Sequence, residues 1–267
     1  MKPYEGYMLD LDGTVYRGKE PIPEAIAFIH QLKEAGLPYL FITNNSSATP
    51  EEVSLKLQAF NVPAEPAQIW TTALAAAAYV KAGPAPHTAY IIGETGLLRA
   101  MEEAGVEYTE ENPAYVVMGI DRGITYEKLA KAALAVRNGA VFISTNSDKA
   151  LPTERGFLPG NGALTSVVQT ATGQDPVFIG KPEQVIIEQA LYILGTPLEK
   201  TVLIGDNYDT DILAGIRTGM DTIHVQTGIT SLEEIEQKPV LPSYSIQSMA
   251  DWTLMKENEE KKQQKVV

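Results

Sequence analysis

The sequence contains no cysteine among its 267 residues, which excludes disulfide bonds, thiolate nucleophiles and cysteine-ligated metal centres. Any bound metal ion must therefore be held by oxygen or histidine ligands. No apolar run reaches the roughly 18 to 20 residues that a membrane-spanning helix needs. The N-terminus also lacks the basic and apolar segments of a secretory signal. We therefore expect a soluble, cytoplasmic protein.

Positive charge is scarce: 21 Lys and Arg residues face 34 Asp and Glu residues, for a net charge of −13. A surface of this sign repels the phosphate backbone of nucleic acids, so we expect neither a nucleic-acid partner nor a membrane partner. A small anionic ligand remains compatible with this charge if local cations receive it. The sequence leaves the oligomeric state open.

Several familiar ligand-binding signatures are also absent. The stretch "GQDPVFIGKP" has six residues between its glycines and a proline after the lysine, so it is no phosphate-binding P-loop. The stretch "DNYDTD" lacks the glycine of an EF-hand calcium loop. His30, His87 and His224 stand apart in the sequence without the partners of a zinc site or a catalytic triad, and we expect structural roles for them.

Strand-like apolar runs alternate along the chain with segments of helical period, which predicts parallel sheets covered by helices. The helix in "PEAIAFIHQLKEAG" carries an apolar stripe and ends at Gly36, a residue typical of a C-terminal cap. The helix in "SSATPEEVSLKLQAF" has Thr49 as its expected N-cap and Pro50 at its first position. The pattern predicts an α/β protein with a doubly wound, Rossmann-like parallel-sheet core.

A Pro- and Gly-rich break at residues 81–87, after which the alternation restarts, predicts a second, smaller α/β domain inserted into the core. The expected segments are the first part of the core, the inserted domain, the second part of the core and a charged tail, at 1–79, 80–174, 175–255 and 256–267.

Two carboxylates, Asp10 and Asp12, end the first apolar strand in "YMLDLDGT". Residues i and i+2 of a strand point to the same side, so the two acids should lie close together. Two close carboxylates do not both ionise easily unless a cation lies beside them. A simple Asp-Gly turn that joins the strand to a loop is the alternative interpretation.

Three further groups of polar residues close later strands of the predicted sheet. They are Thr43, Asn44 and Asn45 in "FITNN", Lys181 in "FIGKP", and Asp206 with Asp211 in "LIGDNYDTD". The simpler alternatives are loop capping for the first group, a solvated surface lysine for the second and acids at a helix N-terminus for the third.

The common position of the four groups favours a binding site. In a doubly wound parallel sheet, ligands bind outside the carboxyl ends of the strands, where all four groups lie. A hard divalent cation such as Mg²⁺ would relieve the repulsion among Asp10, Asp12 and Asp206. Thr43 and Lys181 would then bind the oxygens of a phosphate group.

The four motifs, DxDGT, Thr-Asn-Asn, Gly-Lys-Pro and Gly-Asp-x₄-Asp, occur in the order and at the strand ends typical of the haloacid dehalogenase (HAD) superfamily of Asp-nucleophile phosphatases, which the sequence therefore resembles. The inserted segment, with "MGIDRGITYEKLAKA", "TNSDKALP" and "FLPGNGAL", resembles the subclass IIA, NagD-like members, which carry a type-2 α/β cap. The resemblance covers nearly the whole chain except the last dozen residues.

The resemblance implies a covalent mechanism. Asp10 would attack phosphorus to form an aspartyl-phosphate, and Asp12 would act as general acid and base. Mg²⁺ would be bound by Asp10, the backbone carbonyl of Asp12 and Asp206, with Asp211 orienting these ligands. The phosphoryl group would be bound by Thr43, Asn44, Asn45 and Lys181.

The expected function is thus Mg²⁺-dependent hydrolysis of small phosphomonoesters such as sugar phosphates or nucleoside monophosphates. A phosphomutase or another phosphoryl transferase is the alternative with the same chemistry, and a phosphate-sensing binding protein is the alternative without catalysis. Asp148 and Lys149 in the cap loop "STNSDKALP" are candidates for contacting the leaving group. Relatives specialised for pyridoxal phosphate carry an aromatic-histidine pair where this chain has Lys149, Ala150 and Leu151, which argues against that substrate.

Overall fold

The computed structural model describes residues 2–153 and 155–254 of the chain. They divide into two compact units, each of which is discontinuous in sequence. Of the described residues, the first unit comprises 2–42, 55–68 and 187–254, and the second comprises 43–54, 69–153 and 155–186.

This division places residues 43–54, 69–79 and 175–186 in the second unit, together with most of the predicted inserted domain. The expected domain boundaries at 79/80 and 174/175 remain a prediction. The charged tail expected at 256–267 lies outside the described residues.

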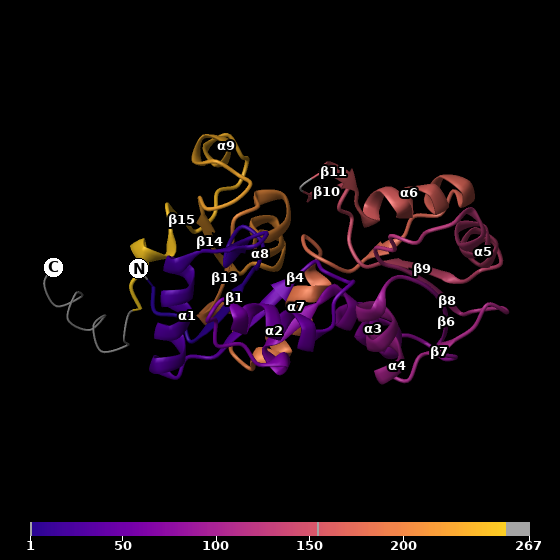
Figure 1. Ribbon diagram of the computed structural model, residues 1–267, viewed down its shortest axis with the longest axis horizontal. Coiled ribbons are helices and arrows are strands. Elements are labelled where there is room, and N and C mark those ends of the chain that lie inside the picture. Colours follow the sequence, from indigo (N-terminus) through magenta and orange to yellow (C-terminus); the bar gives the residue numbers. More distant parts are fainter. Residues whose placement is uncertain (1, 154, 255–267) are drawn as a thin grey trace, which may run out of the picture. The chain divides into compact units, whose positions relative to one another are not determined.

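The first unit is built on parallel strands in the order β15-β14-β13-β1-β4 (Figure 1). Their bounds are β1 (Gly6–Leu9), β4 (Tyr39–Thr43), β13 (Thr201–Gly205), β14 (Asp221–Val225) and β15 (Tyr244–Ile246). All residues of β1, β4 and β13 are buried, as expected for central strands of a parallel sheet covered on both faces.

The second unit contains a separate sheet of parallel strands in the order β12-β9-β8-β6-β7. Their bounds are β6 (Thr88–Ile92), β7 (Glu107–Tyr108), β8 (Tyr115–Met118), β9 (Val141–Ser144) and β12 (Val177–Phe178). Two sheets of parallel strands, each flanked by helices, confirm the predicted α/β fold.

Helices connect the strands in both units. The α-helices that the structure describes are α1 (Pro23–Ala35), α2 (Pro50–Ala59), α3 (Thr72–Ala82), α4 (Thr95–Glu103), α5 (Tyr126–Arg137), α6 (Asn161–Thr172), α7 (Gln184–Leu194), α8 (Leu213–Thr218) and α9 (Leu232–Glu236). Within the second unit, Figure 1 shows α5 and α6 on one side of the sheet and α3 and α4 on the other.

Local signals fix the C-terminal end of α1 and the N-terminal end of α2, as predicted. Gly36 adopts the left-handed conformation, with φ of 67°, and its N–H donates to carbonyl groups of the last turn of α1. Thr49 and Glu52 cap α2 reciprocally: the Glu52 N–H donates to Thr49 Oγ1 at 3.3 Å, and the Thr49 N–H donates to Glu52 Oε2 at 2.8 Å. Pro50 is the first residue of α2.

The core of the second unit follows the two periodicities of strand and helix. Alternate strand residues face α5 and α6, where they pack against Ala132, Val136 and Val168, all of which are buried. The strand residues in this cluster are Tyr90, Ile92, Val116, Met118 and Phe142. The neighbouring Val167 points outward and is 47% exposed, because it lies about 100° around α6 from Val168.

The region expected to be a cap loop contains an antiparallel hairpin, β10 (Ala150–Thr153) and β11 (Gly156–Pro159), which joins neither large sheet. Phe157 of this hairpin is 81% exposed. A second short hairpin, β2 (Tyr16–Arg17) with β3 (Glu20–Pro21), follows β1 in the first unit.

The sequence pattern did not predict α3, which directly follows β5 (Ile69–Thr71). Thr71 caps this helix by accepting a hydrogen bond from Leu74 N at 3.2 Å. The run of alanines in α3 gives no contrast between polar and apolar faces, so periodicity does not reveal it. None of the helices in residues 2–153 and 155–254 combines the length and apolar character required to cross a bilayer.

At the amino end of β14, Asp221 binds three side chains of the first unit. Its carboxylate accepts hydrogen bonds from Lys2 Nζ at 2.8 Å, Tyr4 Oη at 2.9 Å and Ser243 Oγ at 2.8 Å. The Tyr4 ring also stacks on Trp252, with 6.2 Å between ring centroids. These contacts join segments from both ends of the described chain.

Candidate functional site

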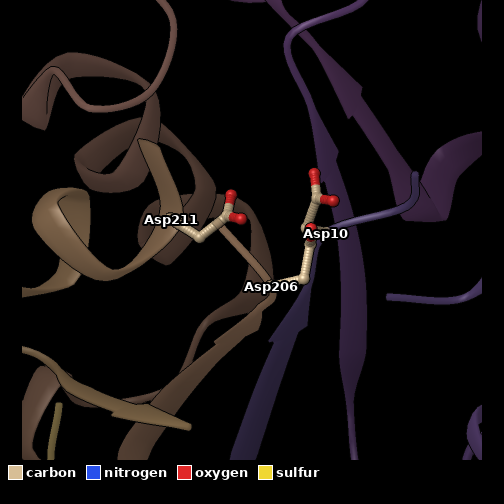
Figure 2. Close-up of side chains that lie close together, drawn as sticks. All are labelled: Asp10, Asp206 and Asp211. Atoms are coloured by element: carbon tan, nitrogen blue, oxygen red, sulfur yellow. The ribbon is translucent and has the colours of Figure 1, made fainter. Parts of the chain in front are cut away.

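Three acids of the first unit form a cluster at the carboxyl ends of β1 and β13. The parallel register pairs Leu9 with Ile204, so Asp10 and Asp206 both follow the sheet at this edge. Asp211 comes from the π-helical turn Tyr208–Ile212, which follows β13. One carboxylate oxygen from each acid lies within 4.8 Å of the others, and Figure 2 shows the three side chains together. Asp10, Asp206 and Asp211 are thus brought together, and the roles expected for them at a metal site remain predictions.

The acid cluster is buried. Asp206 and Asp211 are each 1% exposed and Asp10 is 9% exposed. Asp206 accepts hydrogen bonds from Thr14 Oγ1 at 3.3 Å and from Ile229 N at 2.7 Å. These two donors are neutral groups. They reduce the repulsion among the three close carboxylates but do not cancel the negative charge of the cluster. An all-oxygen donor set of this kind fits a hard divalent cation.

Two glycines make the position of Asp206 possible. Gly13 has φ of 96°, and a Cβ there would lie 2.3 Å from Asp206 Oδ2. A Cβ on Gly228 would lie only 1.8 Å from the same oxygen. Either side chain would displace the carboxylate, so the backbone needs glycine at both positions.

Residues 227–230, which follow β14 and are here called the Asp206 loop, hold the Asp206 carboxylate in place. Ile229 N donates a hydrogen bond to the Asp206 carboxylate, and Thr230 N donates one to the backbone carbonyl oxygen of Asp206 at 3.2 Å. Thr227 Oγ1 donates to Gly13 O at 2.6 Å, and Arg17 Nε donates to Thr227 O. The sequence pattern did not predict this loop, because its contacts are made mainly by backbone groups.

His224, which is fully buried in β14, supports the Asp206 loop. Its Nε2 lies 3.0 Å from Thr230 O, and its Nδ1 lies 2.9 Å from Ser245 Oγ. Burial lowers the pKa of this imidazole, which favours the neutral form. These contacts agree with the structural role expected for the residue.

Asp12 lies outside the acid cluster. Its side chain is exposed, and Oδ1 accepts a hydrogen bond from Gly18 N at 3.2 Å. The nearby Tyr16 has a raised pKa, first because it is buried and then because of the charges of Asp12 and Asp10. Lys56 Nζ lies 3.6 Å from the centroid of the Tyr16 ring, a cation beside this acid that the sequence analysis did not identify.

The predicted phosphate-binding residues belong to the second unit. Lys181 is 2% exposed and Thr43 is 9% exposed. The Asn44 side chain donates from Nδ2 to Lys181 O at 2.9 Å, so the structure brings these two groups together. Asn45 Oδ1 caps its own loop by accepting hydrogen bonds from the backbone N–H groups of residues 47 and 48.

Asp148 and Lys149, the candidates for contacting the leaving group, directly precede β10 in the second unit. Lys149 is exposed and Asp148 is partly buried. Their carbonyl groups accept hydrogen bonds from Gly162 N at 2.9 Å and Gly160 N at 3.0 Å, which attach this segment to the start of α6.

Two family descriptions match the chain. "Haloacid dehalogenase-like hydrolase" matches residues 7–107, and "HAD-hydrolase-like" matches residues 178–252. The first match includes Asp10, Asp12 and the Thr-Asn-Asn motif, and the second includes Lys181, Asp206 and Asp211.

Similar proteins extend the match over nearly the whole chain. The chain is 53% identical over 252 residues to the 5'-nucleotidase YutF of Bacillus subtilis strain 168, which covers 94% of this chain and 98% of that protein. It is 52% identical over 250 residues to the acid sugar phosphatase of Staphylococcus haemolyticus strain JCSC1435, which covers 93% of this chain and 95% of that protein.

Among solved structures, NagD from E. coli K-12 superposes with a TM-score of 0.90 at 33% identity. The superposition covers 95% of this chain and 100% of NagD.

Proposed function

The chain belongs to the haloacid dehalogenase-like hydrolases as a phosphatase of the NagD-like type, and we propose that it hydrolyses small phosphomonoesters with Mg²⁺ as its cofactor. The buried cluster of Asp10, Asp206 and Asp211 carries this proposal, since three carboxylate oxygens within 4.8 Å form a donor set that fits a divalent cation. The names of the two relatives, a 5'-nucleotidase and an acid sugar phosphatase, support nucleoside monophosphates and sugar phosphates as substrate classes.

In the proposed reaction, a carboxylate oxygen of Asp10 attacks phosphorus, and the bond from phosphorus to the leaving oxygen breaks. Asp12 gives its proton to the departing alcohol and becomes the base for the second step. Asp12 then takes a proton from a water molecule, whose oxygen attacks the aspartyl-phosphate and releases Asp10 and inorganic phosphate. The exposed position of Asp12 allows it to exchange this proton with water.

Asp10, Asp206 and the backbone carbonyl of Asp12 would hold the Mg²⁺ ion, with Asp211 orienting them. The ion supplies positive charge beside the phosphoryl group, which lets several acids remain ionised there. Asp206 is fixed for this task by the Asp206 loop and by Thr14, and Asn207 N fixes Asp211 by donating to its Oδ2 at 3.1 Å.

Thr43, Asn44, Asn45 and Lys181 would bind the transferring phosphoryl group. Hydroxyl, amide and ammonium groups donate hydrogen bonds to the equatorial oxygens, whose charge they stabilise. Replacing Lys181 by Ala should therefore lower kcat/KM for every substrate by a similar factor, because all substrates share this group.

A panel of phosphorylated metabolites, with release of inorganic phosphate as the readout, tests the proposal. We expect turnover of several nucleoside monophosphates or sugar phosphates with Mg²⁺, loss of activity in excess EDTA, and recovery when Mg²⁺ is restored. Unchanged activity in EDTA would refute the metal assignment. Transfer of the phosphoryl group to an added alcohol would favour the phosphotransferase alternative, and binding without turnover would favour the phosphate sensor.

Asp10→Asn tests the covalent step. The amide has nearly the same shape but is no nucleophile, so we expect turnover to fall by at least about a thousandfold while the fold is retained. Asp209→Asn is the matched control, because Asp209 lies in the same acidic stretch as Asp211 but its side chain is 78% exposed and pairs with Lys238. A mutant Asp10→Asn enzyme with nearly normal turnover would rule out Asp10 as the nucleophile.

A further inference from the structure

Asn146, which follows β9 in the second unit, has polar contacts on two sides. It is 5% exposed. Its Nδ2 donates to the carbonyl oxygen of Asn44 at 2.8 Å, and its Oδ1 accepts a hydrogen bond from Asp148 N at 3.2 Å. The side chain thus joins two loops that lie far apart in sequence, since 102 positions separate Asn146 from Asn44.

The chain of amides continues beyond Asn44. Asn44 Nδ2 donates to Lys181 O at 2.9 Å. Three successive hydrogen bonds therefore connect Asp148, Asn146, Asn44 and Lys181, and all four residues lie in the same compact unit. Buried amide networks of this kind hold their members in one arrangement, because each lost bond leaves a polar group unsatisfied.

The surrounding packing leaves Asn146 little freedom. Its carbonyl oxygen accepts hydrogen bonds from Ser144 Oγ and from Asn161 Nδ2, each at 3.1 Å. Gly180, next to Lys181, approaches Asn44 so closely that a Cβ would lie 2.7 Å from Asn44 Oδ1. The position of Asn146 is thus set by the core of the unit and transmitted to both loops.

We propose that Asn146 is a positioning residue that couples the loop selecting the leaving group, at Asp148 and Lys149, to the loop binding the phosphoryl group at Asn44, and through the Asn44 side chain to Lys181. This inference rests on the proposed function, which gives the two loops their roles. It goes beyond that function by making phosphate affinity and leaving-group choice depend on one buried amide that contacts neither part of the substrate.

Three substitutions separate this coupling from simple loosening of either loop. Asn146→Ala removes both contacts and should weaken the binding of inorganic phosphate about tenfold while also changing the ratio of kcat/KM between a nucleoside monophosphate and a sugar phosphate. Thr72→Val removes the hydrogen bonds from Thr72 Oγ1 to Asn44 O and Asn45 O, so it should weaken phosphate binding and leave that ratio unchanged. Asp148→Ala should change the ratio and leave phosphate affinity unchanged.

Asn138→Ala is the matched control, because Asn138 is an exposed asparagine of the same unit at the end of α5. It should change neither phosphate affinity, measured by calorimetry with inorganic phosphate and Mg²⁺, nor substrate preference. If Asn146→Ala changes only one of the two quantities, the coupling is refuted. Asn146→Ser, a smaller change that keeps a polar group, replaces Asn146→Ala if the alanine variant does not fold.

Hydrogen exchange tests the coupling without any turnover. The amides of Asn45, Ser47 and Ala48 donate to side chains of their own loop, and their exchange reports whether that loop stays closed. Asn146→Ala should speed exchange in a peptide covering residues 41–49 about tenfold, and Asn138→Ala should leave it unchanged. Unchanged exchange in Asn146→Ala would overturn the inference even if the protein is an active phosphatase. An inactive wild-type protein whose loop exchange still responds to Asn146→Ala would instead overturn the proposed function and leave only the physical connection between the loops.

Discussion

Gly228 of the Asp206 loop leaves no room for a side chain beside the acid cluster. Because a Cβ at this position would lie 1.8 Å from Asp206 Oδ2, Gly228→Ala must move the carboxylate and break its bond from Ile229 N. We expect the Mg²⁺ concentration for half-maximal activity to rise about 10- to 100-fold, as is typical when groups that orient metal ligands are lost. A titration of phosphate release with Mg²⁺ measures this effect.

Gly195→Ala is the control for Gly228→Ala. Gly195 also belongs to the first unit and has φ of 73°, but no atom lies within 4 Å of an added Cβ. The alanine should cost about 1 to 2 kcal/mol of stability through backbone strain alone. An equal change in the Mg²⁺ requirement of both variants would show that Gly228 acts only through general stability.

Asp221 should make the stability of the first unit depend on pH. Burial raises the pKa of this carboxyl, but the hydrogen bonds from Lys2, Ser243 and Tyr4 outweigh burial and leave the pKa lowered. A carboxyl with a lowered pKa in the folded state adds stability that is present above its unfolded pKa of about 3.9 and is lost as the pH falls through the folded pKa.

Asp221→Asn should therefore cost about 1 to 2 kcal/mol at pH 7 and progressively less as the medium becomes acidic. Urea unfolding at several pH values between 2 and 7 measures the difference from the wild type across the folded pKa of this carboxyl. A cost that does not change with pH would show that the charge of Asp221 contributes nothing.

At the level of single elements, α6 offers two adjacent valines in opposite environments. Val168→Ala removes buried methyl groups from the core of the second unit and should destabilise it by about 2 kcal/mol. Val167→Ala makes the same chemical change at a side chain that is 47% exposed and should cost less than about 0.5 kcal/mol. Equal costs in urea unfolding would contradict the packing of α6.

Elements with local signals could be predicted from the sequence, and elements without them could not. Gly36 and the pair of Thr49 and Glu52 mark helix ends through their own backbone preferences, which do not depend on the rest of the molecule. The alanine-rich α3 and the hairpin of β10 and β11 have no such contrast, because their patterns fit a helix, a strand or a loop almost equally well.

The candidate site shows the same limit. Asp10 and Asp206 could be predicted because each follows the end of an apolar strand, and Asp211 because it completes the Gly-Asp-x₄-Asp motif that begins there. The Asp206 loop and the contacts of Asn146 could not, because their hydrogen-bond partners include backbone N–H and carbonyl groups, which nearly all residue types carry.

On the scale of the whole molecule, the chemical groups divide between the two units. Asp10, Asp12 and Asp206 lie in the first unit, whereas Asn44 and Lys181 lie in the second. The sequence order of the motifs did not reveal this division, because the second unit takes residues 43–54 from the middle of the first half of the chain. Residues 43–54 belong to the second unit because the loop after β4 is hydrogen-bonded to Thr72, Gly96 and Asn146 of that unit.

The hairpin of β10 and β11 makes one peptide bond unusually open to proteases. A protease binds its substrate as an extended strand, and Phe157 is already extended, 81% exposed and part of a two-stranded ribbon that no larger sheet supports. Tyr126 and Tyr192 are even more exposed, at 87% and 90%, but lie in helices, which must unwind before cleavage. Brief digestion with chymotrypsin should therefore cut first between Phe157 and Leu158, giving fragments 1–157 and 158–267 by mass spectrometry, and Phe157→Ser should abolish this first cut.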